Sequence, residues 1–164
     1  MRLLFTHPLD PSLRGLPPRG SGDYLLELEH LLSGAKHALQ LVCPFIDSTG
    51  VDVLKAAYNR TPRTADWEIY TRKAPKGLAD VAKRSGWSIY EYVGTPGGDE
   101  HRGFHCKLFL ADNERAILGS ANLIYENLVE NLELGVLLEG PIEVRPLISV
   151  PRALKRASLK LRLV

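Results

Sequence analysis

The feature that most constrains the fold of this chain is a hairpin pattern in its second half. The segment FHCKLFL at 104–110 alternates like a strand, so His105 and Lys107 project from one face and mainly apolar residues from the other. The segment ADNE at 111–114 has turn chemistry, because Asp and Asn bond to their own backbone and tolerate tight turns. The segment RAIL at 115–118 predicts a return strand that pairs with the first. We therefore expect one hairpin that presents an imidazole and an ammonium group on a shared face.

Small and polar residues follow the return strand and add further donor groups. Gly119, Ser120 and Asn122 suit a backbone that approaches a ligand closely. Histidine is a nucleophile and proton carrier near neutral pH, lysine supplies charge to phosphoryl oxygens, and hydroxyl and amide groups supply uncharged donors. The carboxylate of Glu133 can orient the ring of His105 by accepting from its second nitrogen, as carboxylates do in hydrolytic triads. This set of groups predicts a site for a phosphate ester.

The spacing of these residues resembles the HKD signature of the phospholipase D superfamily, H-x-K-x4-D-x6-G-S-x-N followed by N-x-E. The matching positions are His105, Lys107, Asp112, Gly119, Ser120, Asn122, Asn131 and Glu133. Several residue types at fixed spacing make the match specific, whereas a lone His-x-Lys pair indicates only an exposed polar edge. The resemblance implies an enzyme of this superfamily. The residues that it marks as catalytic are His105, Lys107, Ser120, Asn122 and Glu133.

The other motif positions are expected to be structural. Asp112 lies at the turn, too far along the hairpin to sit beside His105, so a turn bond or an ion pair is its expected role. Gly119 and Asn131 are placed in the same structural group. Neither a metal nor a cofactor is expected. His101 and His105 have ligand-like spacing, but no partner Cys or acidic pair lies nearby to complete a zinc site.

The rest of the chain alternates between strand and helix patterns. Strands are predicted at 2–6, 38–43, 67–72, 87–93 and 132–138, helices at 23–34, 48–58, 75–86 and 151–157, and a last strand at 158–164. Residues 7–22 hold four prolines and several glycines, which predicts an irregular connector. This order predicts a single domain over residues 1–164. Its expected fold class is α/β, a three-layer α/β/α sandwich with a mixed β-sheet, as the resemblance also implies.

Caps, cysteines and the chain start give further local predictions. Ser48 or Thr49 is expected to cap the second helix. Cys43 and Cys106 fall in apolar strand-like runs, so both are expected to be buried free thiols. The chain starts MRLLF, without the apolar core and cleavage site of a signal peptide, and has no apolar run of membrane-spanning length. A cytoplasmic protein that does not bind membranes is therefore expected.

A single HKD motif has a consequence for assembly. The resemblance implies that superfamily enzymes use two such motifs, in which one histidine attacks phosphorus and the other protonates the leaving group. The remaining histidines, His7, His30, His37 and His101, have no lysine two positions on. The second motif is therefore expected from another copy of the chain, as in single-motif members of the family. This predicts a two-fold homodimer with one active site at the interface.

Basic residues outside the motif are candidates for substrate binding. His101 and Arg102 lie in the glycine-rich loop before the hairpin, and Arg72 falls at a strand exit. The alternatives are solvated loop residues and a surface salt bridge. After Glu143 the chain has six basic residues and no carboxylate side chain. These residues form either a solvated helix face or a surface that follows a phosphate backbone.

The substrate is less closely defined than the chemistry. The formal net charge is only +2, so bulk charge does not indicate nucleic acid. A small single-motif chain resembles the simple nucleases of the family, the tail is basic, and no amphipathic or lipid-anchor segment is found. We expect an endonuclease, with DNA favoured over RNA. The alternatives are a phospholipase or phosphatidyl transferase, and a non-catalytic nucleic-acid-binding subunit of a larger defence or repair complex.

Overall fold

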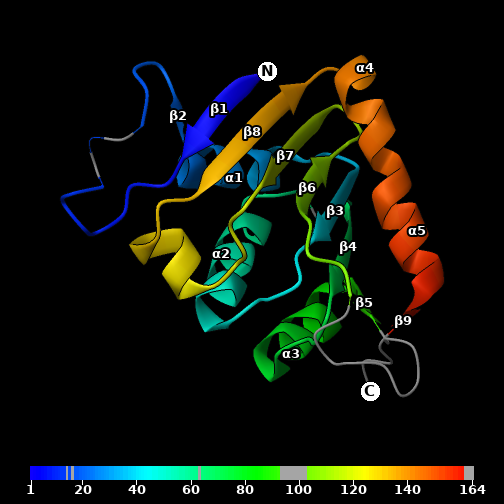
Figure 1. The fold of residues 1–164 in the computed structure, drawn as a ribbon. Helices are drawn as coiled ribbons and strands as arrows, with labels where there is room; N and C mark the ends of the chain where they lie inside the picture. The colour runs from blue at the N-terminus through cyan, green and yellow to red at the C-terminus, as the bar shows by residue number, and fades with distance from the viewer. Residues whose placement is uncertain (14, 16, 63, 93–102, 161–164) are drawn as a thin grey trace.

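The computed structural model describes residues 1–164 apart from 14, 16, 63, 93–102 and 161–164. The described residues form one mixed sheet of nine strands in the order β2-β1-β8-β7-β6-β3-β4-β5-β9 (Figure 1). The strands are β1 (Arg2–Phe5), β2 (Gly22–Asp23), β3 (Ala38–Val42), β4 (Asp66–Thr71), β5 (Ser88–Tyr92), β6 (Lys107–Ala111), β7 (Arg115–Gly119), β8 (Leu134–Glu139) and β9 (Ser158–Lys160).

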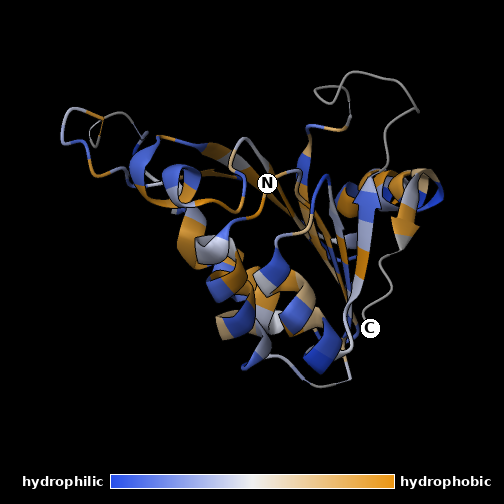
Figure 2. Cartoon of the chain, turned by 90° about the horizontal axis from the view of Figure 1, so that it is seen from below, coloured by the Kyte–Doolittle hydropathy of each residue, from blue (hydrophilic) through white to orange (hydrophobic). Residues whose placement is uncertain are grey.

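Helices cover both faces of this sheet. One face carries α1 (Tyr24–Gly34), α2 (Ser48–Tyr58) and α3 (Lys76–Ser85). The other carries α4 (Pro141–Val144), the 3-10 turn η2 (Arg145–Ile148) and α5 (Ser149–Ala157). Figure 2, which views the molecule from below, shows the two helical layers on opposite sides of the strands. The predicted three-layer α/β/α sandwich with a mixed sheet is therefore confirmed.

The topology brings strand ends that are far apart in the sequence to one edge of the sheet. Strands β3, β4 and β5 are parallel, so their carboxyl ends share an edge. Strand β6 runs antiparallel to β3, so the start of β6, the end of β7 and the start of β8 also lie there. Ser120 and Glu133 lie directly outside the ends of β7 and β8, and His105 lies two residues before β6. We call this edge, marked by those three residues, the open edge.

Strand β6 is buried on both faces, as its apolar sequence requires. Phe109 and Ala111 belong to the larger core, which includes residues of α1, α2 and α3. Leu108 and Leu110 belong to the smaller core, which includes residues of α4 and α5. Lys107 shares the parity of Phe109 and therefore faces the α1 side of the sheet. The predicted alternation is confirmed for residues 107–110, whereas His105 and Cys106 precede the strand.

The cap of α2 differs from the prediction. Asp47, rather than Ser48 or Thr49, caps the helix, because its Oδ1 accepts from the Gly50 N–H at 2.9 Å. The Oδ2 atom of Asp47 also accepts from the Tyr125 N–H at 2.8 Å. A carboxylate offers two oxygens and can serve both donors at once, which a single hydroxyl does less well. The cap therefore also joins α2 to the segment after β7.

The two cysteines lie in different environments. Cys43, directly after β3, is buried as predicted. Cys106 is exposed, contrary to the prediction, because β6 begins one residue later at Lys107. The C-terminal helix and strand are both present as α5 and β9, although residues 161–164 lie outside the described part. Within the described ranges, no helix combines the length and the apolar character needed to cross a bilayer.

Candidate active site

His105 and Lys107 meet at the open edge, where β6 begins. The His105 side chain is exposed, whereas Lys107 is only 4% exposed. The Lys107 Nζ atom lies 3.0 Å from Nδ1 and 3.1 Å from Nε2 of the His105 ring, and it donates to the His105 carbonyl at 2.9 Å. An ammonium group can only donate, so the ring nitrogen that it contacts is an acceptor. A basic ring nitrogen and a fixed cation thus lie side by side at the surface.

The Lys107 cation is held within the protein rather than extended into water. Burial lowers the pKa of this ammonium below its ordinary value, and the acidic groups of Cys43 and Glu133 oppose that effect. A buried cation costs free energy unless an anion approaches it. The site therefore favours a bound anion such as a phosphoryl group.

A second set of polar side chains forms a continuous hydrogen-bonded chain at the same edge. The Ser120 hydroxyl donates to Glu133 Oε2, and Asn127 Nδ2 donates to Glu133 Oε1 at 2.6 Å. Asn127 Oδ1 accepts from the backbone N–H and from Nδ2 of Asn122, each at 3.0 Å. Asn122 and Glu133 are buried, at 8% and 7% exposure. Asn127 lies on the single π-helical turn η1 (Glu126–Glu130) and joins these two buried groups.

The hydrogen bond expected from the His105 ring to the Glu133 carboxylate is not formed. The two carboxylate oxygens of Glu133 accept from Ser120 and Asn127 instead. In the part of the chain that the structure describes, the side chain that bonds to the His105 ring is Lys107. Within one chain, Glu133 therefore fixes the neutral donors of the site rather than the imidazole.

Thr6, which follows β1, holds the segment that leads into β8. Its hydroxyl donates to the Asn131 carbonyl and accepts from the Glu133 N–H, both at 2.7 Å. Asn131 acts here through its backbone, and its side chain is exposed. Neither Thr6 nor Asn127 was identified from the sequence. The signal for Thr6 was weak, a single polar residue at the end of a short apolar strand, and Asn127 has no motif position.

Gly119 allows a close approach between the hairpin and its neighbours. A Cβ atom at this position would lie 2.8 Å from the Leu134 carbonyl oxygen and 3.1 Å from a ring carbon of Tyr24. Contacts that short leave no room for a side chain. The close packing of β7 against β8 and α1, next to Ser120, therefore depends on this glycine.

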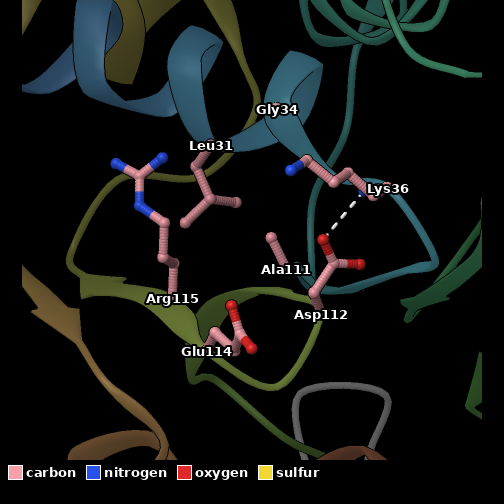
Figure 3. Close-up of a pocket in the computed structure, with 7 residues that line it drawn as sticks. All are labelled: Leu31, Gly34, Lys36, Ala111, Asp112, Glu114 and Arg115. Atoms are coloured by element: carbon pink, nitrogen blue, oxygen red, sulfur yellow. Dashed lines mark hydrogen bonds between the residues drawn. The ribbon is translucent and has the colours of Figure 1, made fainter.

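Asp112 lies at the opposite end of β6 from His105, at the hairpin turn. Its carboxylate accepts from the backbone N–H groups of Lys36, His37 and Ala38, each at 2.8 Å. Figure 3 shows Asp112 beside Lys36, at a pocket that Leu31 and Arg115 also line. Partial burial raises the pKa of this carboxyl, but the three N–H donors together lower it by more than burial raises it. The pKa of Asp112 is therefore below its ordinary value.

Arg72 contacts an aromatic residue, Phe45, that in turn contacts His105. Its guanidinium carbon lies 5.4 Å from the centroid of the Phe45 ring, and Phe45 meets the His105 ring edge-to-face at 6.5 Å between centroids. Phe45 was not identified from the sequence. His101 and Arg102, the other candidates for substrate binding, lie outside the described residues. In the described part, no group of three or more His, Cys, Asp or Glu side chains is placed to hold a metal ion.

Comparison with known families identifies the class of protein. The family model described as "Cardiolipin synthase, PLD-like domain" matches residues 28–150. This range covers most of the chain and contains the whole motif from His105 to Glu133. The chain therefore belongs to the phospholipase D superfamily.

Individual proteins resemble the chain to different extents. The DISARM protein DrmC of Bacillus paralicheniformis is 38% identical over 120 residues, which are 69% of this chain and 48% of that relative. The chain thus spans about half the length of this curated relative. The crystal structure of Nuc, a phospholipase D family member from Salmonella typhimurium, matches with a TM-score of 0.68 at 16% identity, over 98% of this chain and 97% of Nuc. NucT from Helicobacter pylori matches with a TM-score of 0.69 at 14% identity, over 84% and 90%. At such low identity these structures share the fold.

Proposed function

We propose that this protein is a metal-independent phosphodiesterase that cleaves nucleic acid through a phosphohistidine intermediate on His105. The observation that carries the proposal is the exposed imidazole of His105, 3.0 Å from the buried ammonium of Lys107. This arrangement presents a nucleophile and a fixed positive charge to the same phosphoryl group. Membership of the phospholipase D superfamily supports phosphodiester chemistry at this site.

The reaction has two steps. In the first, a ring nitrogen of His105 attacks phosphorus, and the P–N bond forms as the bond to the leaving oxygen breaks. A histidine from a second copy of the chain donates a proton to that oxygen. In the second, the same histidine takes a proton from water, whose oxygen attacks phosphorus and releases His105. Both steps use protein groups and water alone.

Lys107 and Asn122 stabilise the negative charge that develops on the phosphoryl oxygens. An amide nitrogen carries two hydrogens, and among the described residues Asn127 accepts one of them from Asn122 Nδ2, so the other can bind a substrate oxygen. The Ser120 hydrogen points to Glu133 and must rotate before it can reach a phosphoryl oxygen. Glu133 and Asn127 act as positioning groups for these two donors.

A two-fold homodimer supplies the second histidine. The described histidines His7, His30 and His37 each lack a lysine two positions on, so none of them repeats the His105–Lys107 pair within the chain. His105 is exposed at an edge of the sheet, where a second copy can approach it. A symmetric interface centred on this edge brings two identical half-sites together.

Nucleic acid is the substrate class that we favour, with DNA ahead of RNA. Helix α5 and the preceding turn expose Arg145, Arg152 and Arg156, a basic surface that suits a polyanion. The DISARM protein DrmC is a relative of about twice the matched length. This relationship supports a role for the chain as one part of a larger defence assembly.

A phosphatidyl transferase is the second candidate. The matching family model carries the description of a cardiolipin synthase. The open edge also exposes apolar side chains, among them Phe45 and Leu134, which are 42% and 47% exposed. Such residues suit an acyl chain as well as a nucleobase, so the experiment must include a lipid substrate.

The test is cleavage in excess EDTA of labelled single- and double-stranded DNA, the matching RNA oligonucleotides, and phosphatidylglycerol vesicles. We expect wild-type protein to cleave DNA and a His105→Ala variant to be inactive. His30→Ala is the matched control, because His30 is exposed on α1 away from the site. Cleavage that requires added metal, or that survives His105→Ala, contradicts the proposal. Turnover of lipid without cleavage of nucleic acid selects the second candidate.

The homodimer has a separate test in mixed samples. Wild-type protein is exchanged at equal amounts with His105→Ala protein, and activity per total protein is measured. Random exchange leaves about one quarter of the dimers fully wild-type, so activity falls to about one quarter if both histidines are needed. A fall to about one half shows that each chain works alone.

A further inference from the structure

We propose that Phe45 and Arg72 form a stacking subsite for an unpaired nucleobase next to His105, so that the substrate is single-stranded nucleic acid. This inference rests on the proposed phosphodiesterase activity and adds the form of nucleic acid that the same site accepts. It starts from the position of Phe45, whose ring meets the His105 ring at 6.5 Å between centroids. A base on this ring lies beside the phosphate that His105 attacks.

Phe45 is exposed although its backbone is held from several sides. The side chain is 42% exposed. The preceding Pro44 carbonyl accepts from Thr71 Oγ1 at 3.1 Å and from the Arg72 N–H at 3.2 Å. The Phe45 carbonyl accepts from Cys43 Sγ at 3.2 Å. An apolar ring on a fixed backbone is presented to solvent at little entropic cost on binding, which suits a recognition surface.

Further hydrogen bonds join the loop that carries Phe45 to the loop that follows β7. Cys43 Sγ accepts from the Leu123 N–H at 3.3 Å, and the Asp47 N–H donates to the Leu123 carbonyl at 3.0 Å. Asp47 also accepts from the Tyr125 N–H, and the Tyr125 ring is 42% exposed. Two exposed aromatic residues therefore stand on loops that are bonded to each other at the open edge.

The positive charge of Arg72 at the subsite is complementary to the phosphate of a nucleotide. The Arg72 guanidinium carbon lies 5.4 Å from the Phe45 ring centroid, close enough for a cation–π contact. Proteins that bind single strands combine aromatic rings for the bases with cations for the phosphates. In a duplex both faces of each base are covered by neighbouring base pairs, so a ring such as Phe45 cannot stack on them without unstacking. The combination therefore favours an unpaired strand over a duplex.

The test compares two substrates of the same enzyme, a single-stranded oligonucleotide and methyl p-nitrophenyl phosphate, both in EDTA. Phe45→Leu keeps an apolar side chain but removes the aromatic face. We expect it to lower kcat/KM for the oligonucleotide about 10-fold more than for the small ester, mainly through KM. Leu26→Ala is the matched control, because Leu26 is 51% exposed on α1 outside the site. Wild-type protein is also expected to prefer the single strand to the matching duplex.

Three outcomes overturn the inference. Equal losses on both substrates show that Phe45 supports the chemistry rather than a base. Dissociation of the protein to monomers by light scattering shows that Phe45 belongs to the contact between copies. A wild-type preference for duplex excludes the stacking role. If wild-type protein hydrolyses neither substrate, the proposed activity fails, and fluorescence anisotropy still tests the subsite: Phe45→Leu must weaken binding of the single strand about 10-fold.

Discussion

The two ends of the β6–β7 hairpin belong to one sequence motif but have opposite physical character. At the turn, Asp112 is surrounded by partners, and its carboxylate accepts from three backbone N–H groups. At the open edge, His105 is exposed, and the buried Lys107 contacts the His105 ring and donates to the His105 carbonyl. The carboxylate at the turn end is held by backbone donors, whereas the open end places a buried cation beside an exposed imidazole.

The two ends of β6, a strand of 5 residues, therefore have different roles. The turn end stabilises the fold, and the open end carries the chemistry. A carboxylate that accepts several hydrogen bonds lowers the free energy of the folded state, whereas the burial of an ammonium group raises it. Functional sites commonly retain such unfavourable groups while the surrounding structure provides the stability. Substitutions at the two ends should therefore affect different measurements.

The largest effect is expected from His105→Ala. Removal of the nucleophile should lower the rate of phosphodiester cleavage by at least about 1,000-fold. The midpoint of thermal unfolding should stay close to that of wild-type, because the side chain is exposed. Cleavage assays and differential scanning calorimetry on the same preparations check both parts. A large loss of stability would assign His105 to the fold instead.

Lys107→Met should lower cleavage about 100-fold and leave the free energy of unfolding equal to wild-type or higher by about 1 kcal/mol. Met keeps the length of the side chain but removes the buried charge, so a cost to the folded state disappears together with the phosphate contact. Urea titration and steady-state kinetics measure the two quantities. Lys55→Met, on the exposed surface of α2, is the control. A strongly destabilised Lys107→Met protein would show that the cation supports the fold.

Asp112→Asn tests the other end of the hairpin. Loss of the charged acceptor should lower the free energy of unfolding by about 2–4 kcal/mol, because three N–H groups lose a carboxylate partner. Asn tolerates the left-handed backbone that Asp112 adopts at φ 55°, so the turn itself is not strained. Urea titration gives the stability, and kcat measured well below the melting temperature should remain near wild-type. Loss of kcat in a fully folded variant would place Asp112 in the chemistry.

Asn127→Asp should lower kcat about 10-fold near neutral pH, because a carboxylate replaces the amide that donates to Glu133 at 2.6 Å. The new side chain still accepts from Asn122, so the expected defect is repulsion between two carboxylates. Activity of the variant should recover relative to wild-type as the pH falls and one of the two carboxyl groups binds a proton. A pH–rate profile checks this, and a pH-independent loss would indicate a purely structural role for Asn127.

The smallest effect is the pH dependence of stability from Asp112. The pKa of this carboxyl in the folded protein is below its ordinary value. Its contribution is therefore fully present above the unfolded pKa of about 3.9 and is lost as the pH falls through the lower folded pKa. Urea titrations between pH 6 and pH 3 should show a decline in wild-type protein that is weaker in Asp112→Asn. Equal slopes in both proteins would contradict this account.

Local sequence patterns were sufficient to predict the sheet, the hairpin and its turn. Alternation placed Leu108 and Phe109 on opposite faces of β6, and the burial of both confirms it. The turn was predictable because Asp112 and Asn113 adopt positive φ angles, which these residue types tolerate better than most others. Such features depend on residues that are neighbours in the chain.

The partners within the site could not be predicted in the same way. Thr6 contacts Glu133 across 127 positions, and no periodicity indicates such a pairing. Glu133 was assigned to His105 by analogy with hydrolytic triads, but the geometry of η1 places Asn127 between Glu133 and Asn122. The prediction that Cys106 is buried was wrong, because it depended on knowing the first residue of β6 to within one position. Side-chain partners follow from the assembled tertiary structure rather than from local pattern.

The central claim is that His105 carries the phosphoryl group, and trapping the intermediate tests it most directly. Protein in excess EDTA is mixed with methyl p-nitrophenyl phosphate, denatured in alkali within the first turnover, digested, and analysed by mass spectrometry. The account predicts one phosphorylated peptide whose modified residue is His105, with release of one p-nitrophenolate for each group trapped. Rapid turnover with an unmodified His105, or a phosphoryl group on another residue, would contradict it.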